Sequence, residues 1–283
     1  MRKAIGALVT VVLVFIIGFI SWHTNAASKP NNANYHYSQT PTLFLHGYGG
    51  GSSSTKDMIN AAQSSGAATK VLTATVSRSG NVSLSGHWQR GKVNPMVQVI
   101  FKDNKNGHFF QNATWLKRVV TALQRRYHIT QFNVVAHSMG NLDLMYYEAR
   151  FGQKRTLPQI NKYVALAGHF DGILGMDDKA NQNHLLSNGQ PARMNDSYRY
   201  LLKHQANFPK NQISVLNVYG NLNDGTASDG RVSNVSSKSL AYLLGTTPRH
   251  YTAKMITGKG AQHSRLHNNA AVNKLIIDFL WGK

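Results

Sequence analysis

The sequence predicts an α/β domain built on a mostly parallel sheet with helices on both faces, and three observations support this. Short apolar, β-branched runs alternate with helical segments from residue 41 onward. Such alternation is typical of parallel sheets that are covered on both sides. One strand-to-helix junction carries a serine between small residues. Finally, 283 residues with 42% hydrophobic content are enough to bury the core of one large domain.

The elements follow in order along the chain. A short buried strand is expected at 42–45 and a helix at 56–64. Residues 82–88 and 96–101 resemble a hairpin insertion that is joined through Gly91 and Pro95. The remaining elements rest on β-branched runs or on apolar residues at helical spacing. They are strands at 70–76, 132–136, 163–167, 213–219 and 251–256, and helices at 114–127 and 270–281.

The first residues have the pattern of a targeting segment. Arg2 and Lys3 precede an uninterrupted apolar run at 4–20, and small residues follow at 21–28. This predicts a signal peptide or an N-terminal membrane anchor over 1–27, a polar linker over 28–40 and one domain over 41–283. We favour export, so the protein is expected to be secreted or held at the cell surface, outside the cytoplasm. The apolar segment would tether it if it is not cleaved.

The chain contains no cysteine. A lipoprotein needs a cysteine to carry its lipid, so that route of anchoring is excluded. An exported protein without disulfides points to an organism that does not rely on oxidative folding, such as a Gram-positive bacterium.

The charge is strongly positive, with 31 Lys and Arg residues against 11 Asp and Glu residues, a formal net charge of +20. Removal of the two charges on Arg2 and Lys3 leaves +18. The excess positive charge is expected either to keep the protein soluble or to attract it to an anionic cell-wall polymer or an anionic membrane surface. Nucleic acid is not an expected partner, because the basic residues are spread along the chain and form no recognisable motif. The chain is expected to act as a monomer.

The most informative stretch is residues 132–140, where a β-branched run leads into Ser138. Ala136 and Gly140 flank this serine at the second position on each side, and helix-forming residues follow. Such a sharp turn from strand to helix holds a serine in a strained conformation, and larger flanking side chains would clash. The pattern is that of a nucleophile elbow, so Ser138 is the candidate nucleophile.

An acid and a histidine follow later strands, in the chain order serine, acid, histidine. His263 comes after the strand at 251–256, and it is the candidate base that takes the serine proton. Two carboxylates after the strand at 213–219 compete to orient the imidazole. We prefer Asp229, in Asp-Gly-Arg-Val-Ser, over Asp224, which is closer to the strand end. His267 is expected at the start of the last helix.

The candidate oxyanion donors are two backbone N–H groups, one of Met139 directly after the serine. The other lies in the glycine-rich stretch 46–51 after the first strand, with Tyr48 the best candidate. Glycines allow such a loop to pass close to a substrate carbonyl. Alone the loop would be weak evidence, but together with the elbow it supports the same chemistry.

No metal or cofactor is expected. The other histidines have no spacing typical of metal ligands, and most of them are expected at the surface; they are His36, His87, His108, His128, His169, His184, His204 and His250. An insertion at about 169–211 is expected to form a small cap over the site. It contains Asp171, Asp177, Asp178 and Asn181, so a calcium site there is conceivable, although the spacing is not that of an EF-hand.

Four motifs together carry a family resemblance: Leu-His-Gly-Tyr-Gly-Gly, Ala-His-Ser-Met-Gly, Ser-Asp-Gly-Arg-Val and Gln-His-Ser-Arg-Leu-His. Over residues 41 to 281 the chain resembles the poorly characterised Gram-positive cell-surface α/β hydrolases, which are lipase-like in layout. The resemblance implies the α/β-hydrolase fold and a serine hydrolase that acts on small-molecule or lipid esters. An acyltransferase, a thioesterase or a wall-associated binding protein on the same scaffold are the alternatives.

Overall fold

The computed structural model describes residues 32–88, 91 and 93–283. The chain divides into a unit of residues 1–33 and a compact unit of residues 34–283. The expected leader at 1–27 and the first residues of the linker lie outside the described residues. Within the described part, no helix is long and apolar enough to cross a membrane.

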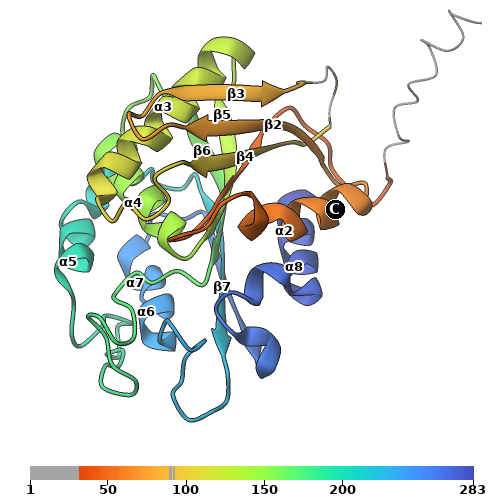
Figure 1. Cartoon of the computed structure of the whole chain (residues 1–283). Coiled ribbons are helices and arrows are strands. Elements are labelled where there is room, and N and C mark those ends of the chain that lie inside the picture. The colour runs from red at the N-terminus through yellow and green to blue at the C-terminus, as the bar shows by residue number, and fades with distance from the viewer. Residues whose placement is uncertain (1–31, 89–90, 92) are drawn as a thin grey trace, which may run out of the picture. The chain divides into compact units, whose positions relative to one another are not determined.

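The compact unit is built on one eight-stranded sheet with the strand order β3-β2-β4-β1-β5-β6-β7-β8 (Figure 1). All neighbouring strands run parallel except β2 and β3. The predicted class, a mostly parallel sheet flanked by helices, is confirmed. The strands are β1 Thr42–Leu45, β2 Thr69–Val76, β3 Val82–Gly86, β4 Pro95–Phe101, β5 Gln131–His137, β6 Gln159–Leu166, β7 Ser214–Asn221 and β8 His250–Thr257.

Helices cover both faces of the sheet and divide the core into two parts. On one face, α3 and α4 pack against the sheet around Leu116, Leu144 and Tyr163. On the other face, α2 and α8 pack around Phe44, Met58 and Ile276. Figure 1 shows these pairs on opposite sides. The helices are α2 Ser52–Ser64, α3 Phe109–Tyr127, α4 Met139–Phe151, α5 Asp196–Lys203, α6 Asn234–Lys238, α7 Leu240–Leu244 and α8 Ala270–Trp281, with short 3₁₀ turns η1 Gln205–Asn207, η2 Lys259–Ala261 and η3 Leu266–Asn268.

The hairpin expected from residues 82–88 and 96–101 is wrong. β3 pairs antiparallel with β2, through a tight turn in which Ser77 N–H donates to the carbonyl of Asn81. β4 lies between β2 and β1 and runs parallel to both. The burial of β4 explains this placement, because six of its seven residues are buried, as expected of a strand covered on both faces. Two helices also begin earlier than expected, α2 at Ser52 and α3 at Phe109.

Parallel strands bring their carboxyl ends to one edge of the sheet, where open α/β sheets bind ligands. The connections that leave β1, β5, β7 and β8 at this edge carry the sequence-predicted residues. The sheet therefore gathers loops that are far apart in the chain.

One carboxylic acid, that of Glu148, is buried in α4. Glu148 is 3% exposed, and its Oε2 atom has no hydrogen-bond partner. Burial raises the pKa of Glu148 to about 8. Together with Met145, Ile160 and Phe208 it lines a small cavity, so the carboxyl group is held in its neutral form by apolar surroundings.

We expect the Glu148→Gln substitution to remove part of the pH dependence of stability. The folded protein keeps the Glu148 proton up to about pH 8, whereas the unfolded chain loses it near the ordinary value of 4.5. Stability contributed by this group is therefore lost as pH rises between these values, by about 1.4 kcal/mol per pH unit. In denaturant unfolding from pH 5 to 8, the free energy of unfolding of the variant should rise relative to that of wild type as pH rises.

The control is Asp196→Asn, because the Asp196 side chain is fully solvent-exposed at 99%. This variant should follow the wild-type curve. A difference between Glu148→Gln and wild type that stays constant across the pH range would contradict the assignment. Asp143, whose pKa burial also raises to about 8, is present in all three proteins and cancels in the comparison.

Candidate active site

Ser138 stands between β5 and α4 in a strained backbone conformation. Its φ is 52° and its ψ is −121°, which is unusual for a residue other than glycine. The small neighbours are needed because the turn is so tight. A Cβ atom at Gly140 would lie 2.8 Å from the carbonyl oxygen of His46. The turn presents the serine hydroxyl at the N-terminus of α4, where the helix dipole favours negative charge.

Three of the sequence-predicted residues form one chain of hydrogen bonds. His263 Nε2 lies 2.9 Å from Ser138 Oγ, and His263 Nδ1 lies 2.8 Å from Asp229 Oδ2. All three residues are nearly buried, with exposed fractions of 9% for Ser138 and His263 and 1% for Asp229. Since the carboxylate accepts from Nδ1–H, the imidazole presents Nε2 to the hydroxyl as an acceptor.

The Asp229 carboxylate is fixed by its own loop, which follows β7. Its Oδ1 atom accepts from the N–H groups of Arg231 at 2.9 Å and Val232 at 2.7 Å, leaving Oδ2 for His263. The Asp229 backbone also contributes, because its carbonyl accepts from His263 N–H at 2.9 Å. The acid thus orients both the ring and the backbone of the histidine.

Asp224, the alternative acid, does not join this chain in the structure. It is exposed, and its Oδ1 atom accepts from the N–H and hydroxyl groups of Thr226. These bonds lower its pKa. Asp224 therefore has the contacts of a turn residue, which its Asp-Gly sequence also allows.

The glycine-rich loop after β1 lies directly against the serine. A Cβ atom at Gly47 would be 2.8 Å from Ser138 Cβ and 3.2 Å from the carbonyl oxygen of His137. Tyr48, a predicted oxyanion donor, is next in this loop, and its side chain is 62% exposed. The other predicted donor, Met139, is the first residue of α4. Met139 directly follows Ser138 in the chain, and Tyr48 directly follows Gly47, which lies against Ser138. The pairing of their two N–H groups as oxyanion donors stays a prediction.

His46 braces this loop. Its Nε2 accepts from Phe101 N–H at 3.1 Å, so the proton lies on Nδ1, which donates to the carbonyl of Gly47 at 2.8 Å. Burial lowers its pKa, although the bond to Gly47 opposes that shift. The sequence identifies His46 only as part of the glycine-rich stretch 46–51. Its role depends on β4, whose position the sequence did not predict.

Two further histidines are buried close to the site. His169 is 6% exposed, and burial lowers its pKa to about 4, with a smaller contribution from His263. His169 is the exception among the histidines expected mostly at the surface, because it follows β6 at the carboxyl edge of the sheet. His137, directly before Ser138, is 5% exposed. His267 lies in η3, just before α8, with its ring centroid 4.9 Å from that of His137.

The expected cap, about 169–211, begins as a loop and continues into α5 and η1. It packs on the loop that carries Asp229. Asp171 N–H donates to Ser236 Oγ, and Ser233 Oγ donates to Asp178 Oδ2. Whether this segment covers Ser138 in function stays a prediction.

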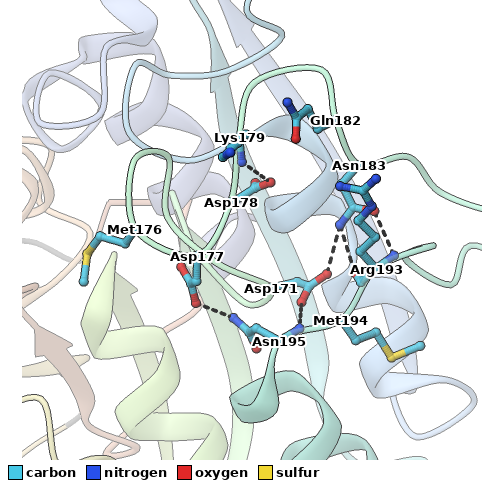
Figure 2. Close-up of a pocket in the computed structure, with 10 residues that line it drawn as sticks. All are labelled: Asp171, Met176, Asp177, Asp178, Lys179, Gln182, Asn183, Arg193, Met194 and Asn195. Atoms are coloured by element: carbon cyan, nitrogen blue, oxygen red, sulfur yellow. Dashed lines mark hydrogen bonds between the residues drawn. The ribbon is translucent and has the colours of Figure 1, made fainter.

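The cap loop holds an open cavity of about 310 Å³. Figure 2 shows three of the chain's few carboxylates around it, at Asp171, Asp177 and Asp178. Each already accepts hydrogen bonds from protein groups, as Asp171 does from Asn195 N–H and Asn183 Nδ2. Among the described residues, no group of three or more His, Cys, Asp or Glu side chains is arranged to hold a metal ion.

The arrangement has the parts that nucleophilic catalysis requires. A serine hydroxyl is a weak nucleophile until a neighbouring base accepts its proton, and His263 is within hydrogen-bond reach. The buried carboxylate of Asp229 can stabilise the imidazolium that forms. Backbone N–H groups at the N-terminus of α4, directly after Ser138, can stabilise negative charge on a substrate oxygen.

Comparisons with known proteins agree with the fold described above. A family sequence model described as "Alpha/beta hydrolase of unknown function (DUF915)" matches residues 29–283. A structure from Listeria innocua is similar with 25% identity and a TM-score of 0.72, covering 86% of this chain and 94% of that one. A "putative cell surface hydrolase" from Lactobacillus plantarum WCFS1 has 21% identity and a TM-score of 0.68, covering 85% and 89%. No curated protein matches the chain.

We expect Gly47→Ala to impair the site, because the new Cβ atom would press against Ser138 and the loop would have to move. Displacement by about 1 Å costs on the order of 100-fold in rate where groups must be aligned. The rate of covalent labelling by a fluorophosphonate probe measures this. The matched control is Gly51→Ala in the same loop, where a Cβ atom meets nothing within 4 Å. Equal labelling rates in the two variants would show that close approach at Gly47 is unimportant.

Proposed function

We propose that this chain, which belongs to the family of alpha/beta hydrolases of unknown function, is an exported serine hydrolase that cleaves carboxylic esters through an acyl-enzyme. The observation that carries the proposal is the hydrogen-bonded series Ser138–His263–Asp229 at the carboxyl edge of the sheet. A binding protein on this scaffold would have no need of a strained serine aligned with a base and a buried acid.

The proposed reaction has two halves. Ser138 Oγ attacks the ester carbonyl carbon while His263 Nε2 takes its proton, and the N–H groups of Met139 and Tyr48 stabilise the oxyanion. The tetrahedral intermediate collapses as His263 returns the proton to the leaving alcohol, which leaves an acyl group on Ser138. Water then attacks the acyl carbonyl with His263 as base, releasing the acid and restoring the serine.

The substrate class that we propose is a small-molecule or lipid ester. Thioester hydrolysis and acyl transfer use the same intermediate and differ in the leaving group or in the acceptor that replaces water. Activity against p-nitrophenyl esters of increasing acyl length, compared with a thioester of the same acyl group, separates these cases.

We also propose that charge helps to retain the protein at the outer cell surface. The +18 left without Arg2 and Lys3 would attract an anionic wall polymer or membrane surface. Interactions between exposed charges are screened over ~8 Å at physiological ionic strength, so added salt weakens such retention.

Ser138→Ala should abolish covalent labelling by a fluorophosphonate probe and lower ester turnover by several orders of magnitude. The reason is that no other hydroxyl group of the described residues is within hydrogen-bond distance of His263 Nε2. Thermal unfolding serves as the control, because the substitution removes one oxygen atom and should leave the fold intact. Turnover that persists in a folded variant would exclude Ser138 as the nucleophile.

Asp229→Asn and Asp224→Asn form a matched pair for the role of the acid. The first should reduce kcat by several orders of magnitude, because an amide cannot stabilise the imidazolium and can favour the wrong tautomer of His263. The second should change kcat little, since the Asp224 carboxylate is exposed and hydrogen-bonds Thr226, whereas the His263 ring is hydrogen-bonded to Asp229. Steady-state kinetics of both variants on one p-nitrophenyl ester provides the measurement. The reverse ranking would assign the acid role to Asp224.

A further inference from the structure

His263 is held in place through both its ring and its backbone. Asp229 accepts hydrogen bonds from the ring Nδ1 and from the backbone N–H, and Ser138 Oγ lies against Nε2. The remaining polar group of the residue is its carbonyl. His137 Nε2 lies 3.2 Å from this oxygen, across 126 residues of chain.

The direction of this hydrogen bond follows from chemistry. A carbonyl oxygen can only accept, so His137 Nε2 carries the proton and donates it. Burial lowers the pKa of His137 well below its ordinary value, and the neighbouring His263 and His267 lower it further, while the bond to the His263 carbonyl opposes the shift. His137 is therefore neutral at neutral pH, with one ring N–H group, and that group is used for this contact.

The donor is rigidly placed. His137 is the last residue of β5, a central strand, and it pairs with Leu166 of β6. His137 is 5% exposed, and its Nδ1 atom faces the glycine-rich loop after β1, where a Cβ atom at Gly47 would lie 3.3 Å from it. The ring also packs against the imidazole of His263, with the centroids 5.0 Å apart.

The loop that carries His263 packs on the sheet at Gly220 of β7 but makes few other hydrogen bonds to it. Within the part of the chain that the structure describes, the remaining hydrogen bonds of residues 259–266 stay inside the segment 258–269. Asp229 holds this loop from one side, but it belongs to a loop itself. His137 connects the His263 backbone directly to the strand that ends at the nucleophile.

We propose that His137 is a positioning residue that holds the backbone of His263, and with it the imidazole, within reach of Ser138. This role rests on the proposed function, because its catalytic value requires that His263 acts as the base for Ser138. The hydrogen bond itself, however, can be tested without turnover.

The test compares His137→Gln with His137→Met. Glutamine carries an N–H donor at the same number of bonds from Cβ as His Nε2, whereas methionine has nearly the same length and volume without a donor. We expect His137→Met to lower kcat by about 10- to 100-fold with KM nearly unchanged, because alignment is lost and substrate contacts are not. His137→Gln should recover most of the loss.

A second measurement is independent of activity. The Nδ1 proton of His263, hydrogen-bonded to Asp229, should give a low-field proton NMR resonance in wild type and in His137→Gln. In His137→Met it should broaden or exchange faster. Wild-type kcat values and wild-type resonances in both variants would overturn the proposal. So would the same loss of kcat in both variants, because it would show that only the packing of the His137 ring matters. If wild type does not react with a fluorophosphonate probe, the proposed function fails, while the resonance still decides the role of His137.

Discussion

The contact between His263 Nε2 and Ser138 Oγ, 2.9 Å long, is the interaction on which the rest of the site depends. It joins residues that are 125 positions apart in the chain. Only the sheet can bring them together, because parallel strands β5, β7 and β8 end at one edge and deliver the serine, the acid and the histidine there. The helices on both faces contribute by burying the strands so that this edge is rigid.

Close approach of the backbone is the second constraint. Ser138 has a positive φ, and Gly47 and Gly140 lie where a side chain would strike Ser138 Cβ or the carbonyl oxygen of His46. Buried histidines then hold the loops around this turn through hydrogen bonds. His46 ties the glycine-rich loop to β4, and His137 ties the loop of His263 to β5. Neutral imidazoles suit this role, since each provides one donor and one acceptor in a small ring.

The sequence predicted the parts of the site that depend on local pattern. Contiguous residues define the elbow at Ser138, the loop at 46–51 and the strands before Asp229 and His263. The family resemblance that these segments carry is confirmed. What it missed depends on contacts between distant segments. The position of β4 inside the sheet goes with its burial on both faces. The apolar run at 96–101 alone does not show whether this strand lies inside the sheet or forms one arm of a hairpin. The burial of His169 and the contact of His137 with His263 likewise arise only when loops after different strands meet. Asp229 and Asp224 share one loop, so only the folded geometry separates their contacts.

The central claim is that an ester is cleaved through an acyl group on Ser138. Peptide mapping by mass spectrometry, after acid quench of the protein during turnover of p-nitrophenyl acetate, tests it most directly. We expect one acetyl group on the peptide that contains Ser138, and we expect it to be lost when the quench is delayed until the ester is consumed. Steady hydrolysis with no acyl adduct, or an adduct on another residue, would contradict it.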